Sequence, residues 1–256
     1  MTRDPHGDVT PRRGVRLAVL GVVENFFSRF GFPDPLLRMI AERARLRTVK
    51  RGEECFDLRP GRRIYLLTEG CIREELDLSH TRLWRSTIFG DWTGGGRYGG
   101  SRGTVLSTEA HGLFLGLDDV RQIGVVHPEF FLALAVLSQA RLEAAETVYG
   151  ASRLPPVTRV ATLLSHLASQ NTYVYATRPV YGGAKRIVRK ARQDVVEGPT
   201  QADIADALGL SRAAVENAIR DLRSRGVLKQ QPGMSRVHRF YEIDRDAFQD
   251  LMLETL

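Results

Sequence analysis

The segment 200–222, TQADIADALGLSRAAVENAIRDL, constrains the fold of this chain more than any other segment. Ile204 and Leu208 lie at helical spacing, and Gly209 follows them where the end of a helix needs a residue with positive φ. Ser211 is an N-cap residue for a second helix, because its hydroxyl can accept a hydrogen bond from a free backbone N–H. The segment therefore predicts two short helices joined by a tight turn, a helix-turn-helix.

The second helix of this pair has an apolar side and a polar side. Val215, Ile219 and Leu222 form the apolar stripe. A helix of this diameter fits the major groove of DNA, where arginine and asparagine bond base edges. The outward residues, which we expect to contact DNA, are Arg212, Ala213, Glu216, Asn217 and Arg220, and Ser211 at the start of the helix is a further expected DNA contact.

These outward residues have different expected roles. Arg212 and Asn217 are predicted to read bases. Ala213 offers a methyl-sized contact, and Glu216 is a candidate acceptor from cytosine. Arg220 is expected to position the phosphate backbone instead, as are Thr200 and Gln201 at the start of the first helix.

A β-hairpin is expected after the helix pair. The extended runs 226–231 and 237–243 flank a Pro-Gly turn, which predicts the wing of a winged helix-turn-helix. Helical hairpins of this kind also occur in domains that bind protein, so a protein-binding module remains the alternative. The basic wing residues favour DNA, and they are Lys229, Arg236, His238 and Arg239.

Composition limits the remaining classes. The 256 residues suffice for one large or two ordinary domains, and the net charge of +7 favours polyanionic partners or an anionic membrane surface. No apolar run is long enough to span a bilayer, and no secretory signal is visible, so we expect a cytoplasmic protein without a membrane partner. The two cysteines form no metal-binding spacing, so no metal is expected.

The pattern of predicted strands and helices along the chain indicates an α+β fold with an N-terminal antiparallel β-roll. Short β-type runs alternate with glycines and charged turns between Arg47 and Leu117, which is typical of a roll or barrel. The runs are 47–49, 63–68, 71–76, 83–88, 103–108 and 112–117. The predicted parts are a disordered N-terminus at 1–14, the roll with flanking helices at 15–127, a long helix at 128–154 and the winged helix-turn-helix at 155–256.

The helix predicted over 128–153 is apolar on two faces. One face is expected to cover the roll and the other a partner subunit, although a single monomer that buries both faces remains an alternative. Pro155 and Pro156 end this helix, and another amphipathic helix follows at 157–169. The first face comprises Leu134, Leu137, Ala144 and Val148, and the second Phe131, Ala135, Leu142 and Ala145.

The connector 170–198 carries a basic run without an acidic residue between Arg178 and Arg192. It is open to two interpretations, a solvated loop or an additional element that contacts phosphates.

The order of a roll, a long helix and a C-terminal winged helix-turn-helix resembles the Crp/Fnr family of bacterial transcription regulators. The resemblance covers nearly all of residues 36–245 and is strongest in the helix-turn-helix, whose second helix starts with Ser211-Arg212. Three further segments are similar to family motifs, namely 63–70, 88–92 and 157–164.

The resemblance implies a homodimer built on residues 128–153. Two recognition helices would then occupy successive major grooves about 34 Å apart, on a near-palindromic double-stranded DNA site. RNA polymerase is a further partner that the family suggests, although no residue here points to it. A constitutive DNA binder whose roll only supports dimerisation is the alternative.

Family sensors bind a cyclic nucleotide in the roll, and the match here is partial. Asp91, after Gly90, stands in place of the family's glutamate, and Arg102 aligns with its phosphate-binding arginine. Gly103 replaces the neighbouring serine, and Arg141 matches an inward arginine of the long helix. The positions that contact the base fall on alanines or a glutamate, at 144–146. A cyclic nucleotide, another ligand and no ligand all remain open.

Other sensor chemistries and catalysis have little support. Two cysteines are too few for an iron–sulfur cluster. Haem ligation by Cys71 or His80 is conceivable, and Cys55 and Cys71 are either a redox pair or two buried thiols. No catalytic motif accompanies the histidines, so the chain is not predicted to be an enzyme.

Overall fold

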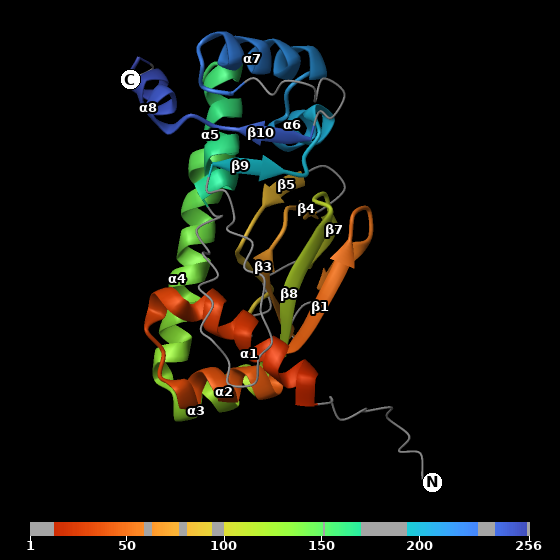
Figure 1. Ribbon diagram of the computed structural model, residues 1–256, viewed down its shortest axis with the longest axis vertical. Helices are drawn as coiled ribbons and strands as arrows, with labels where there is room; N and C mark the ends of the chain where they lie inside the picture. Colours follow the sequence, from red (N-terminus) through yellow and green to blue (C-terminus); the bar gives the residue numbers. More distant parts are fainter. Residues whose placement is uncertain are drawn as a thin grey trace, which may run out of the picture.

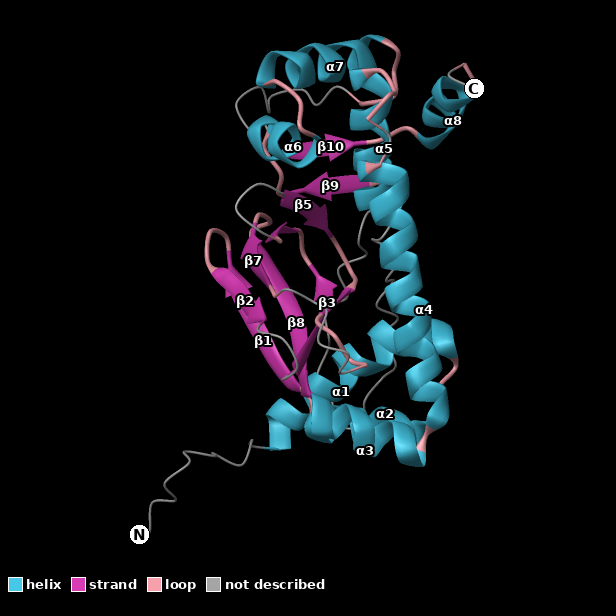
Figure 2. Cartoon of the chain, turned by 180° about the vertical axis from the view of Figure 1, so that it is seen from behind, coloured by secondary structure: helices cyan, strands magenta, loops and turns pink. Residues whose placement is uncertain are grey.

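The computed structural model places helices at one end, a β-roll in the middle and a helix-turn-helix at the opposite end (Figures 1 and 2). A helical rod along one side joins the two ends. None of the described helices combines the length and the apolar character needed to cross a bilayer. The structure describes residues 13–58, 63–76, 81–93, 100–150, 152–169, 194–229 and 239–254.

Three helices close the end of the roll where the chain begins. Their contact is apolar, since Phe26, Phe27 and Leu36 are fully buried. The helices are α1 (Arg13–Phe27), α2 (Asp34–Arg43) and α3 (Leu117–Val126). Because α1 begins at Arg13, the expectation of disorder over 1–14 is wrong for its last two residues.

The predicted β-roll is confirmed as two four-stranded antiparallel sheets, with strand orders β1-β8-β3-β6 and β2-β7-β4-β5. Strand β2 is not among the predicted runs. The run 83–88, expected to be one strand, is two, because the φ of Ser86 is 40° and breaks the extended backbone. The strands are β1 (Arg45–Lys50), β2 (Glu54–Leu58), β3 (Arg63–Glu69), β4 (Ile72–Glu75), β5 (Thr81–Trp84), β6 (Ile88–Phe89), β7 (Ser101–Val105) and β8 (Glu109–Gly116).

Large aromatic side chains fill the space between the two sheets. Phe56, Tyr65 and Phe89 are fully buried there, with ring centroids 4.7 to 6.3 Å apart. Gly112 lies under the Tyr65 ring, where a Cβ atom would stand 2.1 Å from the tyrosine hydroxyl. Only glycine fits at that position, so the aromatic core determines the residue on the neighbouring strand.

The long helix is present as α4 (Pro128–Ala144), which continues as a π-helical turn through Ala145–Tyr149. It ends at Tyr149, earlier than the predicted end at 153–154, and α5 (Pro156–Ser169) follows. The two helices form the rod seen beside the roll in Figure 1. All four residues of the predicted first face are buried.

The second apolar face of α4 differs from the prediction. Phe131 stacks on Trp92 of the roll at 6.0 Å, and Ala145 is buried, so the monomer itself covers part of that face. The apolar side chains left in solvent are Leu132, Val136 and Leu142. The error arises because Trp92 reaches the helix from the loop after β6, a contact that helical periodicity does not reveal.

The C-terminal domain contains the predicted helix pair, and its sheet includes a strand that the sequence does not predict, because residues 195–197, assigned to a connector, pair with the strand after the wing. Among the described residues, the two wing runs are joined by the Leu228–Ile243 bridge and by backbone bonds from Lys229 N–H to the Glu242 oxygen and from Asp244 N–H to the Val227 oxygen. The basic segment 178–192 and the wing tip lie outside the described residues. The elements are β9 (Val195–Glu197), α6 (Gln201–Leu208), α7 (Arg212–Ser224), β10 (Phe240–Glu242) and α8 (Arg245–Leu253).

The C-terminal domain and the roll share a core. Cys71, Leu83 and Leu106 of the roll belong to the same buried cluster as the helix-turn-helix, and α6 lies between α7 and the roll in both views (Figures 1 and 2). Polar contacts reinforce this seam, since Arg85 donates to the backbone oxygen of Val195 at 2.9 Å. At the predicted domain boundary, residue 155, one helix therefore gives way to the next, but the two parts of the chain share one buried core.

Burial of His166 on α5 predicts a dependence of stability on pH. Desolvation lowers its pKa from 6.5 to about 4, where its ring meets Trp84 edge-on at 6.0 Å. The unfolded chain takes up this proton near pH 6.5 and the folded chain only near pH 4, so stability falls as the pH drops through that window. We expect a loss of about 3 kcal/mol.

Urea unfolding at several pH values measures this loss. His166→Phe should remove that part of the pH dependence while retaining an aromatic contact with Trp84. An equal loss in the variant would show that other groups cause it.

Candidate nucleic-acid interface

The turn between α6 and α7 is capped at each helix end, as predicted. Thr200 and Asp203 form a reciprocal capping box at the start of α6. Gly209 ends α6 in the left-handed conformation, with φ 61°. Ser211 then accepts a hydrogen bond from the backbone N–H of Ala214 at 3.1 Å. These caps fix the direction in which α7 leaves the turn.

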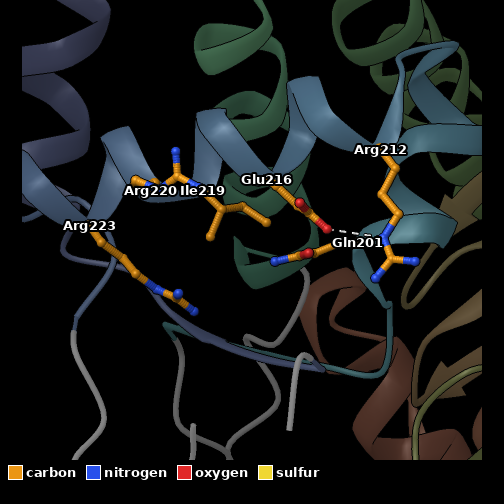
Figure 3. Close-up of a pocket in the computed structure, with 6 residues that line it drawn as sticks. All are labelled: Gln201, Arg212, Glu216, Ile219, Arg220 and Arg223. Atoms are coloured by element: carbon orange, nitrogen blue, oxygen red, sulfur yellow. Dashed lines mark hydrogen bonds and ion pairs between the residues drawn. The ribbon is translucent and has the colours of Figure 1, made fainter. Parts of the chain in front are cut away.

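The polar side of α7 forms an exposed basic surface. Beside it lies a depression of about 330 Å³ that also involves the start of α6 (Figure 3). Three arginines and one glutamate line it, so the surface is net positive and suits an anion. The lining residues are Gln201, Arg212, Glu216, Ile219, Arg220 and Arg223.

Arg223 is the lining residue that the sequence analysis does not include. It lies three residues after Arg220 and seven after Glu216, so helical spacing places it on the same side of α7. Helical spacing could therefore have identified Arg223 from the sequence, but the predicted set of contacts ends at Arg220.

Two pairs of side chains are bonded along α7. Arg212 donates through Nε to Oε1 of Glu216 at 3.1 Å, which Figure 3 shows as a dashed line. Arg220 donates through Nη1 to Oδ1 of Asn217 at 2.8 Å. Ala213, predicted to be a base contact, is also exposed. All five outward residues are thus at the surface of one helix.

The residues predicted to contact the DNA backbone differ from one another in how they are bonded within the protein. The hydroxyl of Thr200 donates to Oδ2 of Asp203 at 2.6 Å, so its proton is committed within the capping box. Lys229 forms an ion pair with Glu242 at 3.5 Å, and Arg239 immediately precedes β10. Arg236 and His238 lie outside the described residues.

A family model for this type of domain matches residues 158–250, and its description is Crp-like helix-turn-helix domain. Residues 158–250 form a Crp-like helix-turn-helix domain. The predicted helix-turn-helix of the Crp type is thereby confirmed, and it follows the β-roll in the expected order. No match is found among curated proteins.

Solved structures share the fold of most of the chain. FixK2 from Bradyrhizobium japonicum is 18% identical, with a TM-score of 0.57 over 81% of this chain and 96% of its own. CooA from Carboxydothermus hydrogenoformans is 15% identical, with a TM-score of 0.55 over 89% and 95%. A cyclic nucleotide-binding domain containing protein from Listeria monocytogenes is 17% identical, with a TM-score of 0.55 over 91% and 99%.

The predicted effector arginine of the long helix points into the roll, where a glutamate of β4 holds it. Arg141 bonds both carboxylate oxygens of Glu74 at 2.6 Å, and Glu74 is completely buried. The indole N–H of Trp84 donates to the same carboxylate at 2.7 Å. The guanidinium also lies over the rings of Trp84 and Phe89. Arg141 is therefore already paired with an internal anion.

The other predicted phosphate ligand lies on the opposite face of its sheet. Strand register pairs Gly103 with Glu74, and Arg102 with the outward-facing Glu75. Arg102 accordingly forms an exposed ion pair with Glu54 at 3.1 Å. A serine at position 103 has no room, because a Cβ there would stand 2.5 Å from the Phe56 ring.

Asp91, the predicted ribose ligand, takes part in a local turn. Its Oδ1 accepts from the backbone N–H of Thr93 at 2.9 Å and from the Thr93 hydroxyl at 2.5 Å. Gly90 before it has φ 94° and packs against the backbone of Arg63. The five predicted effector residues therefore do not converge on one anion.

The cysteines are free thiols in separate buried positions, so the predicted alternative of a redox pair is not formed. Burial raises the pKa of Cys55 and of Cys71 to about 12, which keeps both protonated at neutral pH. Within the described ranges, no three His, Cys, Asp or Glu side chains gather as metal ligands. His80 lies outside those ranges.

The Glu74–Arg141 pair predicts a large cost on removal of one partner. Arg141→Met keeps an apolar stem but leaves the Glu74 carboxylate buried without its counter-ion. We expect the free energy of unfolding to fall by about 3–5 kcal/mol, measured in urea. Arg102→Met is the matched control, and its exposed pair should be worth less than about 1 kcal/mol. Equal losses would contradict the structural role given to the buried pair.

Proposed function

We propose that this chain is a homodimeric regulator that reads a near-palindromic DNA site with α7 of each subunit. The observation that carries the proposal is the exposed basic face of α7, held by caps at both helix junctions of a Crp-like domain. A helix is about 10–12 Å across, which matches the width of the major groove.

Residues near the start of α7 are the proposed base readers. Arg212 supplies the guanidinium fork, Ala213 a small apolar contact and Asn217 an amide. Gln201 and Arg223 border the same depression and are proposed to bind phosphates, together with Arg220 and the basic residues of the wing. For Thr200 we propose a positioning role through the capping box, because its hydroxyl proton is committed.

The proposed dimer interface lies along α4. Leu132, Val136 and Leu142 are 67%, 49% and 53% exposed, which leaves a row of large apolar side chains in water. Such a row favours association with a second copy of the same helix. A two-fold axis along α4 would relate two α7 helices, as a symmetric site requires.

Replacement of Arg212 tests the reading role. Arg212→Ala should weaken binding to the preferred duplex by about 1–3 kcal/mol and relax preference at one position of each half-site. Fluorescence anisotropy with single-base variants of the duplex measures both effects. Arg225→Ala is the control, because Arg225 is paired with Asp221 and Glu254 away from this face. An equal loss for all sequences would make Arg212 a phosphate anchor.

Charges placed on the exposed row test the dimer. The double variant Leu132→Asp, Val136→Asp should raise the dimer dissociation constant at least about 100-fold, because unpaired charges are costly in an apolar interface. Sedimentation measures the mass, and Leu253→Asp, at an equally exposed leucine of α8, is the control. A dimer that withstands the double variant would locate the interface elsewhere.

Salt dependence separates DNA binding from the alternative of a protein-binding module. The logarithm of DNA affinity should fall linearly with the logarithm of salt concentration, with a slope set by the number of phosphate contacts. Weak binding without this slope would contradict the proposed function.

A further inference from the structure

The two bonded pairs on α7 restrict what its base-reading side chains can offer to DNA. Each pair joins an expected reader, Arg212 or Asn217, to a neighbour one turn away. The bonded atoms are specific: Nε of the arginine in one pair, and the amide oxygen of the asparagine in the other. These choices determine which donors and acceptors remain for a base edge.

Arg212 is held by the atom that guanine does not use. A bidentate guanine contact employs an arginine fork against O6 and N7. Glu216 accepts from Nε, on the inner side of the guanidinium, and leaves the two terminal nitrogens directed outward. The side chain of Arg212 is 72% exposed, so this end is accessible. Glu216 thereby orients Arg212 toward guanine.

Asn217 is restricted in the opposite sense. Reading adenine requires the amide oxygen to accept from N6 while the amide nitrogen donates to N7. Arg220 already donates to that oxygen at 2.8 Å, which occupies one of its two lone pairs and weakens it as an acceptor from N6. The NH₂ group still donates, and guanine offers it acceptors at both N7 and O6, whereas adenine offers N7 beside the N6 donor. Asn217 so held favours guanine over adenine.

We propose that Glu216 and Arg220 are positioning residues that set base preference, one by presenting Arg212 to guanine and the other by weakening the amide oxygen of Asn217 as an acceptor from adenine. Ion pairs and hydrogen bonds of this kind are weak on a free surface, but they strengthen when the groove excludes water. The inference rests on the proposed function, because it concerns the same helix in the same groove.

Selection of bound duplexes from a random DNA pool, with and without cAMP, tests this proposal. The full-length protein is compared with Arg220→Met and Glu216→Ala, and Asn217→Ala identifies the base pair that Asn217 reads. Arg223→Met is the matched control, because it removes the same charge from the same face of α7 without touching either pair. Thermal unfolding checks that each variant is folded.

The proposal predicts a change in base identity as well as in affinity. In Arg220→Met, adenine should gain about 10-fold relative to guanine at the Asn217 position. In Glu216→Ala, the guanine preference at the Arg212 position should drop about 10-fold. Arg223→Met should lower affinity equally for all sequences.

Two contrary outcomes are distinct. If the unaltered protein selects a motif but Arg220→Met and Glu216→Ala retain its base preferences, Arg220 and Glu216 are not positioning residues and the inference is overturned alone. If the unaltered protein selects no motif in either arm, the proposed function itself is overturned, and this inference with it.

Discussion

The buried ion pair between Glu74 and Arg141 fixes the long helix α4 against the roll. Its two oxygen contacts at 2.6 Å, with the Trp84 indole on the same carboxylate, hold α4 against the inside of the roll. The hydroxyl of Tyr149 adds a second attachment, since it bonds both the N–H and the oxygen of Leu83. Because α4 leads through the proline break into α5, the position of the DNA-binding domain follows from these contacts.

Because of the same pair, the inside of the roll differs from an open pocket that binds an anion. An internal carboxylate neutralises the inward arginine, and the other aligned arginine faces outward on its strand. The seam between the roll and the Crp-like domain is likewise filled, by an apolar cluster and by Arg73, which bonds Asp203 of the capping box at 3.4 Å. The roll thus supports the start of α6, from which α7 takes its direction.

The helix-turn-helix could be predicted because its signals are local in the sequence. Other features could not be predicted, because they depend on contacts between residues far apart in the chain. Gly209 and Ser211 mark their helix ends through their own backbone requirements, so the pattern alone located both helices. Glu74 and Arg141 are 67 positions apart, and nothing near either residue identifies the other. The exposed face of α4 was assigned incorrectly for the same reason, since Trp92 covers Phe131 from another element. Strand β9 escaped prediction because its three residues become a strand only by pairing with β10.

Site-directed cleavage of DNA from α7 tests the central claim most directly. Cys55 and Cys71 are both fully buried, so Ala213→Cys provides one accessible thiol among the described residues for an iron chelate that cleaves nearby DNA. On a duplex recovered by selection, the account predicts two symmetric zones of cleavage about one helical turn apart, with the offset of major-groove attack. Uniform cleavage along the duplex, or none at concentrations that saturate binding, would contradict a regulator that reads DNA with this helix.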